Sequence, residues 1–208
     1  FVMKKLVIAL GIMVATANMQ VLAADAVAGK AQTLVCAACH GADGNSVVPT
    51  FPKLAGQNKK YLLKQLIEIK SGARSIPTMA GQLNAMNGKD LANIAAYYAS
   101  QTTSLGQTKA DLVDLGAKVY RAGSRERGVA ACIGCHSPTG VGNGPAGYPL
   151  LAGQHADYIA AQLRAFRRGA EYDDGRKNDG DTRIMRDIAL RITDKEIDAV
   201  ASYIEGLY

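Results

Sequence analysis

Cys36-Ala37-Ala38-Cys39-His40 and Cys132-Ile133-Gly134-Cys135-His136 are two copies of one five-residue motif. The pattern Cys-x-x-Cys-His is the attachment site of c-type haem. Its two thiols form thioethers with the porphyrin vinyl groups, and its histidine supplies the proximal ligand of the iron. All four cysteines of the chain and two of its three histidines lie in these motifs. We therefore expect two covalently bound haem c groups, held at Cys36, Cys39, Cys132 and Cys135 and ligated by His40 and His136.

Cysteine pairs of this kind also occur in zinc sites and in thiol redox proteins. A four-cysteine zinc site usually separates its two pairs by about 15–20 residues, whereas Cys39 and Cys132 are 93 positions apart. A thioredoxin-like pair lies next to a βαβ pattern, and the sequence around these pairs is not rich in strand-forming residues. Neither alternative explains the repeated histidine, so the motifs favour haem attachment.

The two halves of the chain repeat one another beyond the motifs. The segment Pro52–Gln57 (PKLAGQ) recurs as Pro149–Gln154 (PLLAGQ), shifted by 97 positions. Apolar residues recur at helical spacing in both halves, whereas the polar segment TTSLGQTKA is typical of a linker. The sequence thus predicts an all-α protein of two tandem domains related by internal duplication, each wrapped around one haem. The expected divisions are 1–24 as signal peptide, 25–101 as the first domain, 102–110 as the linker and 111–208 as the second domain.

Methionine is the expected second axial ligand, because a histidine and a methionine together give a haem iron a raised potential suited to electron transfer. The first half offers Met79 and Met86, and the second half offers only Met185. Helix caps are predicted at Asn87 and Thr193, three positions before Asp90 and Glu196, and aligning Asp90-Leu91 with Glu196-Ile197 gives a shift of 106. The same shift places Met79 on Met185. We therefore predict Met79 and Met185 as ligands and Met86 as a core residue.

The change of shift from 97 to 106 indicates a nine-residue insertion between Glu171 and Arg183. This stretch is polar and lacks apolar periodicity, so we expect a solvent-exposed loop, with a loop that shapes one haem edge or a partner surface as the alternative. The third histidine, His155, aligns with Asn58 at the start of a predicted helix. We expect it to be a cap or a surface group rather than a haem ligand.

The N-terminal residues have the pattern of a secretory signal peptide. Met3-Lys4-Lys5 precedes an apolar run from Leu6 to Ala17, and small residues follow, with the cleavage site expected after Ala23 or Ala24. The apolar run is shorter than the roughly 20 residues of a bilayer-spanning helix. Export also agrees with haem attachment, which takes place across the membrane. We therefore expect a periplasmic protein, with a membrane anchor as the alternative.

The chain resembles the cytochrome c4 family over essentially the whole mature sequence. The resemblance lies in the two haem motifs, in CHGADGN after the first, in FPKLAGQ and YPLLAGQ, and in IMRDIA around Met185. It implies two class I cytochrome c folds around a pseudo-twofold axis, with the haem propionate edges facing each other. It also implies that the carbonyls of Pro52 and Pro149 accept the ring N–H of the proximal histidines, with ordinary turn prolines as the alternative.

The resemblance further implies electron transfer in a periplasmic respiratory chain. The donor would be a protein such as a quinol-oxidising complex and the acceptor a terminal oxidase, with peripheral membrane association and a two-domain monomer. No enzymatic activity is expected, because methionine closes both irons. Two alternatives stay open: the cytochrome subunit of a larger dehydrogenase such as a flavocytochrome, and a dihaem peroxidase.

Charge is distributed unequally between the two halves. Residues 25–101 contain eight Lys and Arg against four Asp and Glu, whereas residues 102–208 contain fourteen of each. We expect the first domain to present the more positive face to an acidic redox partner, with an attraction that salt screens. Nucleic-acid binding is not expected, because no cluster of basic residues is interleaved with aromatic residues.

Overall fold

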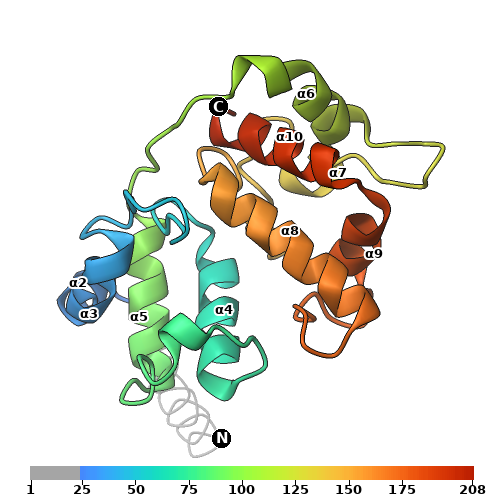
Figure 1. Cartoon of the computed structure of the whole chain (residues 1–208). Helices are drawn as coiled ribbons and strands as arrows, with labels where there is room; N and C mark the ends of the chain where they lie inside the picture. The colour runs from blue at the N-terminus through green and yellow to red at the C-terminus, as the bar shows by residue number, and fades with distance from the viewer. Residues whose placement is uncertain (1–23) are drawn as a thin grey trace, which may run out of the picture.

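The computed structural model describes residues 24–208, so the predicted signal peptide lies outside the described residues except for its last position. Within that range the chain forms helices and loops, with two isolated β-bridges and no strand. The predicted all-α class is confirmed. Figure 1 shows two helical lobes, one from each half of the sequence, joined by a single extended segment.

The first lobe is built on two helix crossings. Its elements are α2 (Ala26–Gln32), α3 (Leu34–His40), α4 (Lys59–Ser71), the 3₁₀ helix η1 (Pro77–Met79) and α5 (Gly88–Ala99). Helices α2 and α4 both pack against α5. At the first crossing Gly29 is required, because a Cβ atom there would lie 2.1 Å from the Asn93 carbonyl oxygen. The core of the lobe comprises Leu62, Ile94, Ala95, Tyr97 and Tyr98.

The second lobe repeats this arrangement with a longer third helix. Its elements are the 3₁₀ helix η2 (Ala110–Leu112), α6 (Val113–Ala122), α7 (Ile133–His136), α8 (Ala156–Glu171), α9 (Ile184–Arg191) and α10 (Asp194–Glu205). Helix α6 crosses α10 as α2 crosses α5, again at a glycine: a Cβ atom on Gly116 would lie 2.4 Å from the Ala199 carbonyl oxygen. Helix α8 packs on α9 and α10, and none of the described helices is long and apolar enough to cross a membrane.

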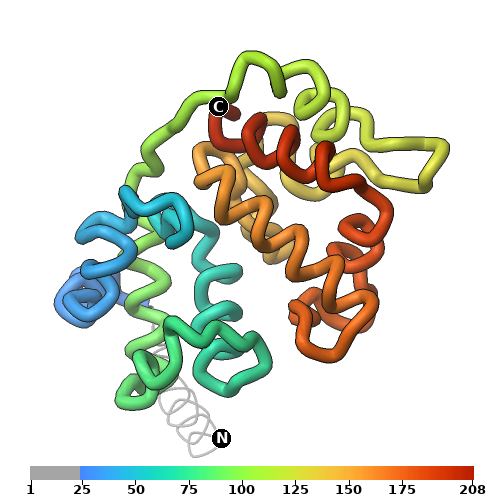
Figure 2. The backbone as a smooth tube through the Cα atoms, in the orientation of Figure 1, coloured from blue at the N-terminus to red at the C-terminus, as the bar shows by residue number. Residues whose placement is uncertain are grey.

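The segment between the lobes is held by hydrogen bonds to both of them. Ser104 N donates to Asn45 Oδ1 in the first lobe at 2.8 Å, and Gly106 N donates to the Glu205 carbonyl in the second at 3.0 Å. The tube in Figure 2 follows this segment from the end of α5 to η2. The predicted linker is therefore extended and anchored, which restrains the two lobes relative to each other.

Both predicted helix caps are present as complete capping boxes. The Asn87 side chain accepts from the N–H of Asp90, whose carboxylate accepts from the N–H of Asn87, and Thr193 and Glu196 exchange the same pair of bonds. Each box satisfies backbone donors that the first turn of a helix leaves without partners. The boxes begin α5 and α10, the two C-terminal helices on which the lobes are built.

The Glu196 box also provides a pH-dependent contribution to stability. Arg127 Nη1 donates to Glu196 Oε2 at 2.7 Å, and the hydrogen bonds from Arg127 lower the pKa of Glu196 to about 2 from an ordinary 4.5. A carboxyl group with a lowered folded-state pKa stabilises the fold above its unfolded pKa and loses that contribution as the pH falls through its folded value.

We expect Glu196→Gln to lower the free energy of unfolding by about 1 kcal/mol near neutral pH and to reduce the stability lost between pH 4.5 and about 2. Denaturant unfolding at a series of pH values measures both effects. Asp173→Asn, which removes the exposed Lys177–Asp173 ion pair, is the control and should behave like the unsubstituted protein. Equal acid sensitivity of the Glu196→Gln variant and the unsubstituted protein would contradict this assignment.

Candidate haem sites

The first haem motif lies on one face of a short helix. Cys36, Cys39 and His40 are three and four positions apart on α3, so their side chains share a face. Gly41 follows with a φ of 78°, a left-handed conformation that ends the helix directly after the histidine. In the second motif Cys132 is the N-cap of α7 and His136 is its last residue. The four cysteines form no disulfide.

Each motif histidine is oriented by a proline carbonyl. His40 Nδ1 lies 2.9 Å from the Pro52 oxygen, and His136 Nδ1 lies 3.1 Å from the Pro149 oxygen. Because a carbonyl can only accept, Nδ1 carries the proton in both rings and Nε2 presents its lone pair. Burial lowers the pKa of both histidines, which favours the neutral imidazole that binds a metal. Both hydrogen bonds are those that the family resemblance implied.

The predicted sixth ligands lie in the lobes of their histidines. Met79 is the last residue of η1, and Met185 is the second residue of α9. Both methionines line the same cavity as His40 and His136. Met86 packs against the core of the first lobe. The roles of Met79 and Met185 as ligands stay predictions.

One continuous cavity of about 1830 Å³ receives residues from both lobes. A single small-molecule site usually encloses about 300–1,000 Å³, so this cavity has the volume for two groups of that size. The four motif cysteines and both motif histidines line it. Apolar side chains from both lobes complete the lining, among them Leu62, Leu66, Ile94, Leu163, Phe166 and Val200. These residues fit a pair of large apolar prosthetic groups.

The thiol groups do not resemble those of a redox-active cysteine pair. Burial raises the pKa of the Cys36 thiol and raises that of Cys132 to about 11. Reactive cysteines in disulfide exchange have lowered pKa values, because the thiolate is the nucleophile. The dithiol interpretation therefore does not agree with the environment of these side chains.

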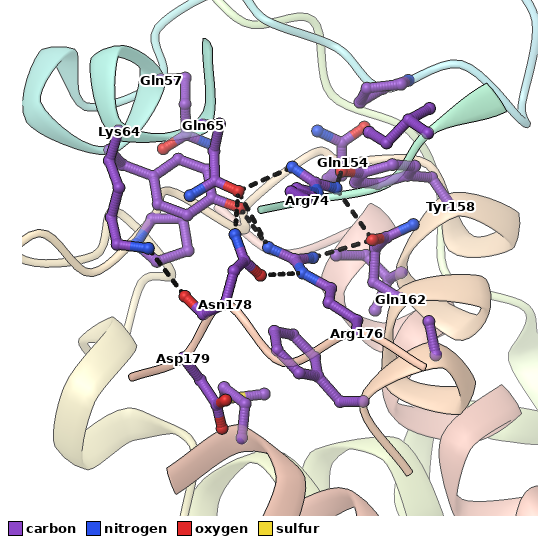
Figure 3. Close-up of a pocket in the computed structure, with 18 of the residues that line it drawn as sticks. Gln57, Lys64, Gln65, Arg74, Gln154, Tyr158, Gln162, Arg176, Asn178 and Asp179 are labelled. Carbon is purple, nitrogen blue, oxygen red and sulfur yellow. Dashed lines mark hydrogen bonds between the residues drawn. The ribbon is translucent and has the colours of Figure 1, made fainter. Parts of the chain in front are cut away.

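A buried arginine lies at the boundary between the lobes. Arg74 donates to Gln65 Oε1 at 2.8 Å within its own lobe, and to Tyr158 OH at 3.0 Å and Gln162 Oε1 at 2.9 Å in the other lobe. Figure 3 shows these partners converging on the guanidinium group. All four residues line the cavity.

A second arginine, Arg176 of the insertion, shares two of these hydrogen-bond partners with Arg74. It donates to Gln162 Oε1 at 2.8 Å, to Gln65 Oε1 at 3.2 Å and to Tyr61 OH at 3.3 Å. Within residues 24–208 neither Arg74 nor Arg176 forms an ion pair with a carboxylate. Two guanidinium groups beside one cavity fit ligands that carry carboxylates, as haem propionates do.

Sequence reasoning did not identify this arginine cluster, although the repeat contained a signal. The pairs Tyr61/Tyr158 and Gln65/Gln162 recur at the shift of 97. Repetition of polar residues on helices that otherwise repeat only apolar positions is a sign of a shared polar contact. The arginines themselves have no repeat counterparts, because Arg74 aligns with Glu171 and Arg176 lies in the insertion.

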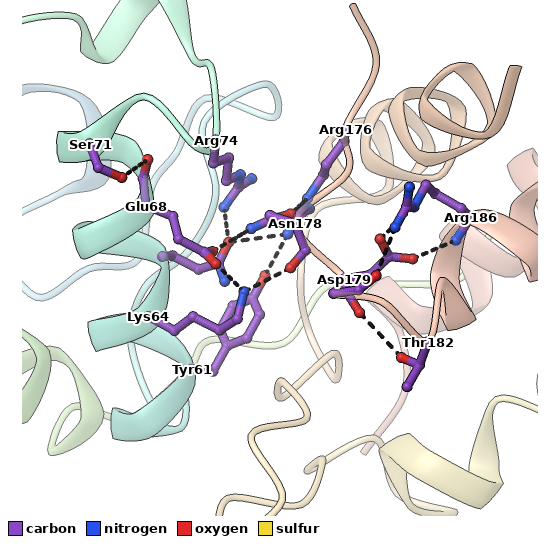
Figure 4. Close-up of polar contacts among 12 residues, drawn as sticks. Tyr61, Lys64, Glu68, Ser71, Arg74, Arg176, Asn178, Asp179, Thr182 and Arg186 are labelled. Carbon is purple, nitrogen blue, oxygen red and sulfur yellow. Dashed lines mark hydrogen bonds and ion pairs between the residues drawn. The ribbon is translucent and has the colours of Figure 1, made fainter. Parts of the chain in front are cut away.

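The insertion is only in part the solvent-exposed loop that its composition predicted, because residues 171–174 and 180–183 are exposed whereas residues 175–179 are half-buried. Within the insertion, the side chain of Asn178 donates to Gln65 Oε1 at 2.8 Å and to Glu68 Oε2 at 2.7 Å. The backbone carbonyl of Asn178 accepts from Lys64 Nζ at 2.7 Å (Figure 4). These contacts join the second lobe to α4 of the first. The loop is therefore an interdomain strap. Its polar composition reflects polar partners in the other lobe.

His155 also differs from expectation. It occupies the N-cap position of α8 but makes no side-chain cap, and it is only 8% exposed. Its Nε2 donates to the Ser46 carbonyl of the other lobe at 2.7 Å, and its Nδ1 lies 3.5 Å from Glu205 Oε1. The predicted cap or surface role was wrong because the start of α8 faces the first lobe. His155 is not one of the residues that line the cavity.

The comparisons with known proteins agree with this geometry. The cytochrome c family model matches two segments of the chain, residues 26–102 and 113–207. Cytochrome c4 from Pseudomonas aeruginosa is 50% identical over 206 residues, which cover 99% of this chain and 100% of that protein. The crystal structure of reduced recombinant cytochrome c4 from Pseudomonas stutzeri has a TM-score of 0.86 at 49% identity, covering 89% of this chain and 100% of that chain.

A further relative has a different description. The thiosulfate dehydrogenase electron acceptor of Stutzerimonas stutzeri is 39% identical over 175 residues, which cover 82% of this chain and 77% of that protein. The two sequences are thus similar over most of both lengths.

Proposed function

Because this chain belongs to the cytochrome c4 family and is therefore an electron carrier with two covalently bound haem c groups, we propose that it passes single electrons through the periplasm from a quinol-oxidising complex to a terminal oxidase. Bound haem supplies the one-electron couple, and Cys36, Cys39, Cys132 and Cys135 hold it. The residues His40, Met79, His136 and Met185 are proposed as the axial ligands. The predicted signal peptide supports the periplasmic location.

One observation carries the choice of a carrier over an enzyme with an open iron. In each lobe a proline-oriented histidine and a methionine face the same cavity. Two protein ligands leave no coordination position for a substrate, and the pair of a nitrogen and a thioether raises the potential. This ligand set is suited to electron transfer and not to peroxide chemistry.

The proposal is tested with the haem-loaded, chemically reduced protein and membranes that contain the terminal oxidases of the host. We expect the protein to be reoxidised with matching oxygen uptake, and the rate to fall as salt rises, because the more positive first lobe attracts an acidic partner. An oxidase-deficient membrane preparation is the control. Failure of the membranes to reoxidise the protein at any salt concentration would rule out delivery to a terminal oxidase.

A second candidate function is suggested by the Stutzerimonas stutzeri relative named as the electron acceptor of thiosulfate dehydrogenase. In that case a soluble dehydrogenase, rather than a quinol-oxidising complex, would reduce the protein. The two donors are distinguished by incubating the oxidised protein either with quinol and host membranes or with thiosulfate and a thiosulfate dehydrogenase. The faster reduction identifies the donor class.

A further inference from the structure

Two glutamines form equivalent hydrogen bonds across the lobe boundary, each with the backbone of one residue in the opposite lobe. Gln154 Oε1 accepts from Lys53 N at 2.8 Å, and its Nε2 donates to Lys53 O at 2.8 Å. In the equivalent contact, Gln57 Oε1 accepts from Leu150 N at 2.8 Å, and its Nε2 donates to Leu150 O at 2.9 Å. Both glutamines are buried. Each is the last residue of its LAGQ repeat, so the internal duplication accounts for the symmetry.

The first of these contacts reaches an axial histidine through a single peptide group. The N–H of Lys53 and the carbonyl of Pro52 belong to one peptide unit. That carbonyl lies 2.9 Å from His40 Nδ1. The chain of bonds therefore runs from Gln154 Oε1 in the second lobe, through the Pro52–Lys53 peptide, to the imidazole in the first lobe.

The second contact repeats the connection in the opposite direction. Leu150 N–H and the Pro149 carbonyl share a peptide unit, and the carbonyl lies 3.1 Å from His136 Nδ1. Gln57 in the first lobe thus bonds the peptide that orients the histidine of the second lobe. Each lobe thus supplies one hydrogen-bond acceptor to the proline peptide that orients the histidine of the other lobe.

We propose that Gln57 and Gln154 are positioning residues. Each strengthens, through a proline peptide, the hydrogen bond that orients the axial histidine of the opposite domain. Hydrogen bonds in a chain polarise one another by about 10–30% per bond. A peptide whose N–H is engaged is a better acceptor at its carbonyl. A stronger bond from histidine Nδ1–H increases the basicity of Nε2, which favours the oxidised iron and lowers its potential.

A structural role alone would predict a different pattern. A glutamine that only joins the lobes would, when replaced, loosen the interface and affect both haems or the haem of its own lobe. The tuning role predicts a crossed pattern, in which each substitution acts on the opposite haem. The inference rests on the proposed function only through iron ligation by His40 and His136.

The test uses the haem-loaded two-domain protein carrying Gln154→Met or Gln57→Met. These substitutions keep the side-chain length and remove both interdomain hydrogen bonds, together with the bond that each Oε1 accepts from the N–H of the next residue. NMR of the ring-methyl signals follows each haem separately during a redox titration. NMR of the reduced protein also records the Nδ1–H signals of His40 and His136. Oxidase turnover, measured separately, tests the carrier function, so failure of the inference and failure of the proposed function give different results.

For Gln154→Met we expect the His40 Nδ1–H signal to move upfield. The reduced-to-oxidised ratio of the haem at Cys36 and Cys39 should rise by about threefold to tenfold at a fixed potential, and a tenfold change is about 59 mV for one electron. The other haem should change less. Gln57→Met should produce the same changes at His136 and its haem, with the smaller change at the haem of the first lobe. If one variant does not fold, the other still tests the inference.

Asn178→Ala is the matched control, because it removes interdomain bonds to Gln65 and Glu68 without a contact to either proline peptide. It should leave both Nδ1–H signals in place. The inference is overturned if the glutamine variants shift neither Nδ1–H signal, if they shift the haem of their own lobe most, or if they behave like Asn178→Ala.

Discussion

Replacing Met185 by alanine in the haem-loaded protein is expected to lower the potential of one haem by on the order of 100 mV, because axial ligands spread haem potentials over about 0.8 V. The thioether is the group that raises the potential of a His/Met site. Its loss leaves an open coordination position. The reduced variant should therefore bind carbon monoxide at one haem, whereas the unsubstituted protein should bind none under native conditions.

The chain contains a matched control for this experiment. Met86→Ala removes a methionine that packs against the core of the first lobe, and it should leave both potentials and the near-infrared methionine-to-iron band unchanged. Met79→Ala should repeat the effect of Met185→Ala at the other haem. Retention of the full near-infrared band after Met185→Ala would show that another residue is the ligand, and carbon monoxide binding by the unsubstituted protein would favour an enzyme with an open iron.

The second large effect concerns folding without haem. Without haem, the apolar side chains that line the cavity of about 1830 Å³ would face water instead of a porphyrin, and burial of one such side chain contributes about 1.5–3 kcal/mol. Small proteins are stable by only about 5–15 kcal/mol. We expect the chain produced without haem to lack a cooperative thermal transition and most of the helical circular dichroism of the holoprotein.

The measurement compares the holoprotein with a variant in which all four motif cysteines are serine and which is produced where haem attachment does not occur. A variant with only Cys132→Ser and Cys135→Ser is informative as well, because it should retain the first haem and show whether the first lobe folds when the second cannot. A cooperative unfolding transition in the haem-free chain would show that the lobes have a sufficient core of their own.

Local spacing explains why the sequence was informative about the haem sites. Cys36, Cys39 and His40 need only one turn of helix to share a face, and that relation holds in any helix. The capping boxes at Asn87 and Thr193 are equally local and are present as predicted. The repeat then placed Met79 and Met185 in equivalent positions, and the structure brings both into the cavity that contains the histidines.

The expectation for His155 was wrong and that for the insertion was right only at its two ends, and both departures concern contacts between the domains. The polar insertion around Arg176 and Asn178 was expected to be exposed, and His155 was expected to cap a helix or face solvent. Both instead donate hydrogen bonds to the other lobe. A polar side chain that is buried against polar partners has the same sequence pattern as one in water, so composition and periodicity do not separate the two cases.

The sequence by itself determined the two haem groups, the helical class and the duplication, and it predicted the attachment residues, because each depends on spacing within one segment or on alignment of one half with the other. Only the tertiary structure decided how the halves meet. Gln57 and Gln154 bond residues 93 and 101 positions away, and Arg176 reaches a tyrosine 115 positions away. Such contacts follow from the relative placement of two folded lobes, which no local pattern of residues specifies.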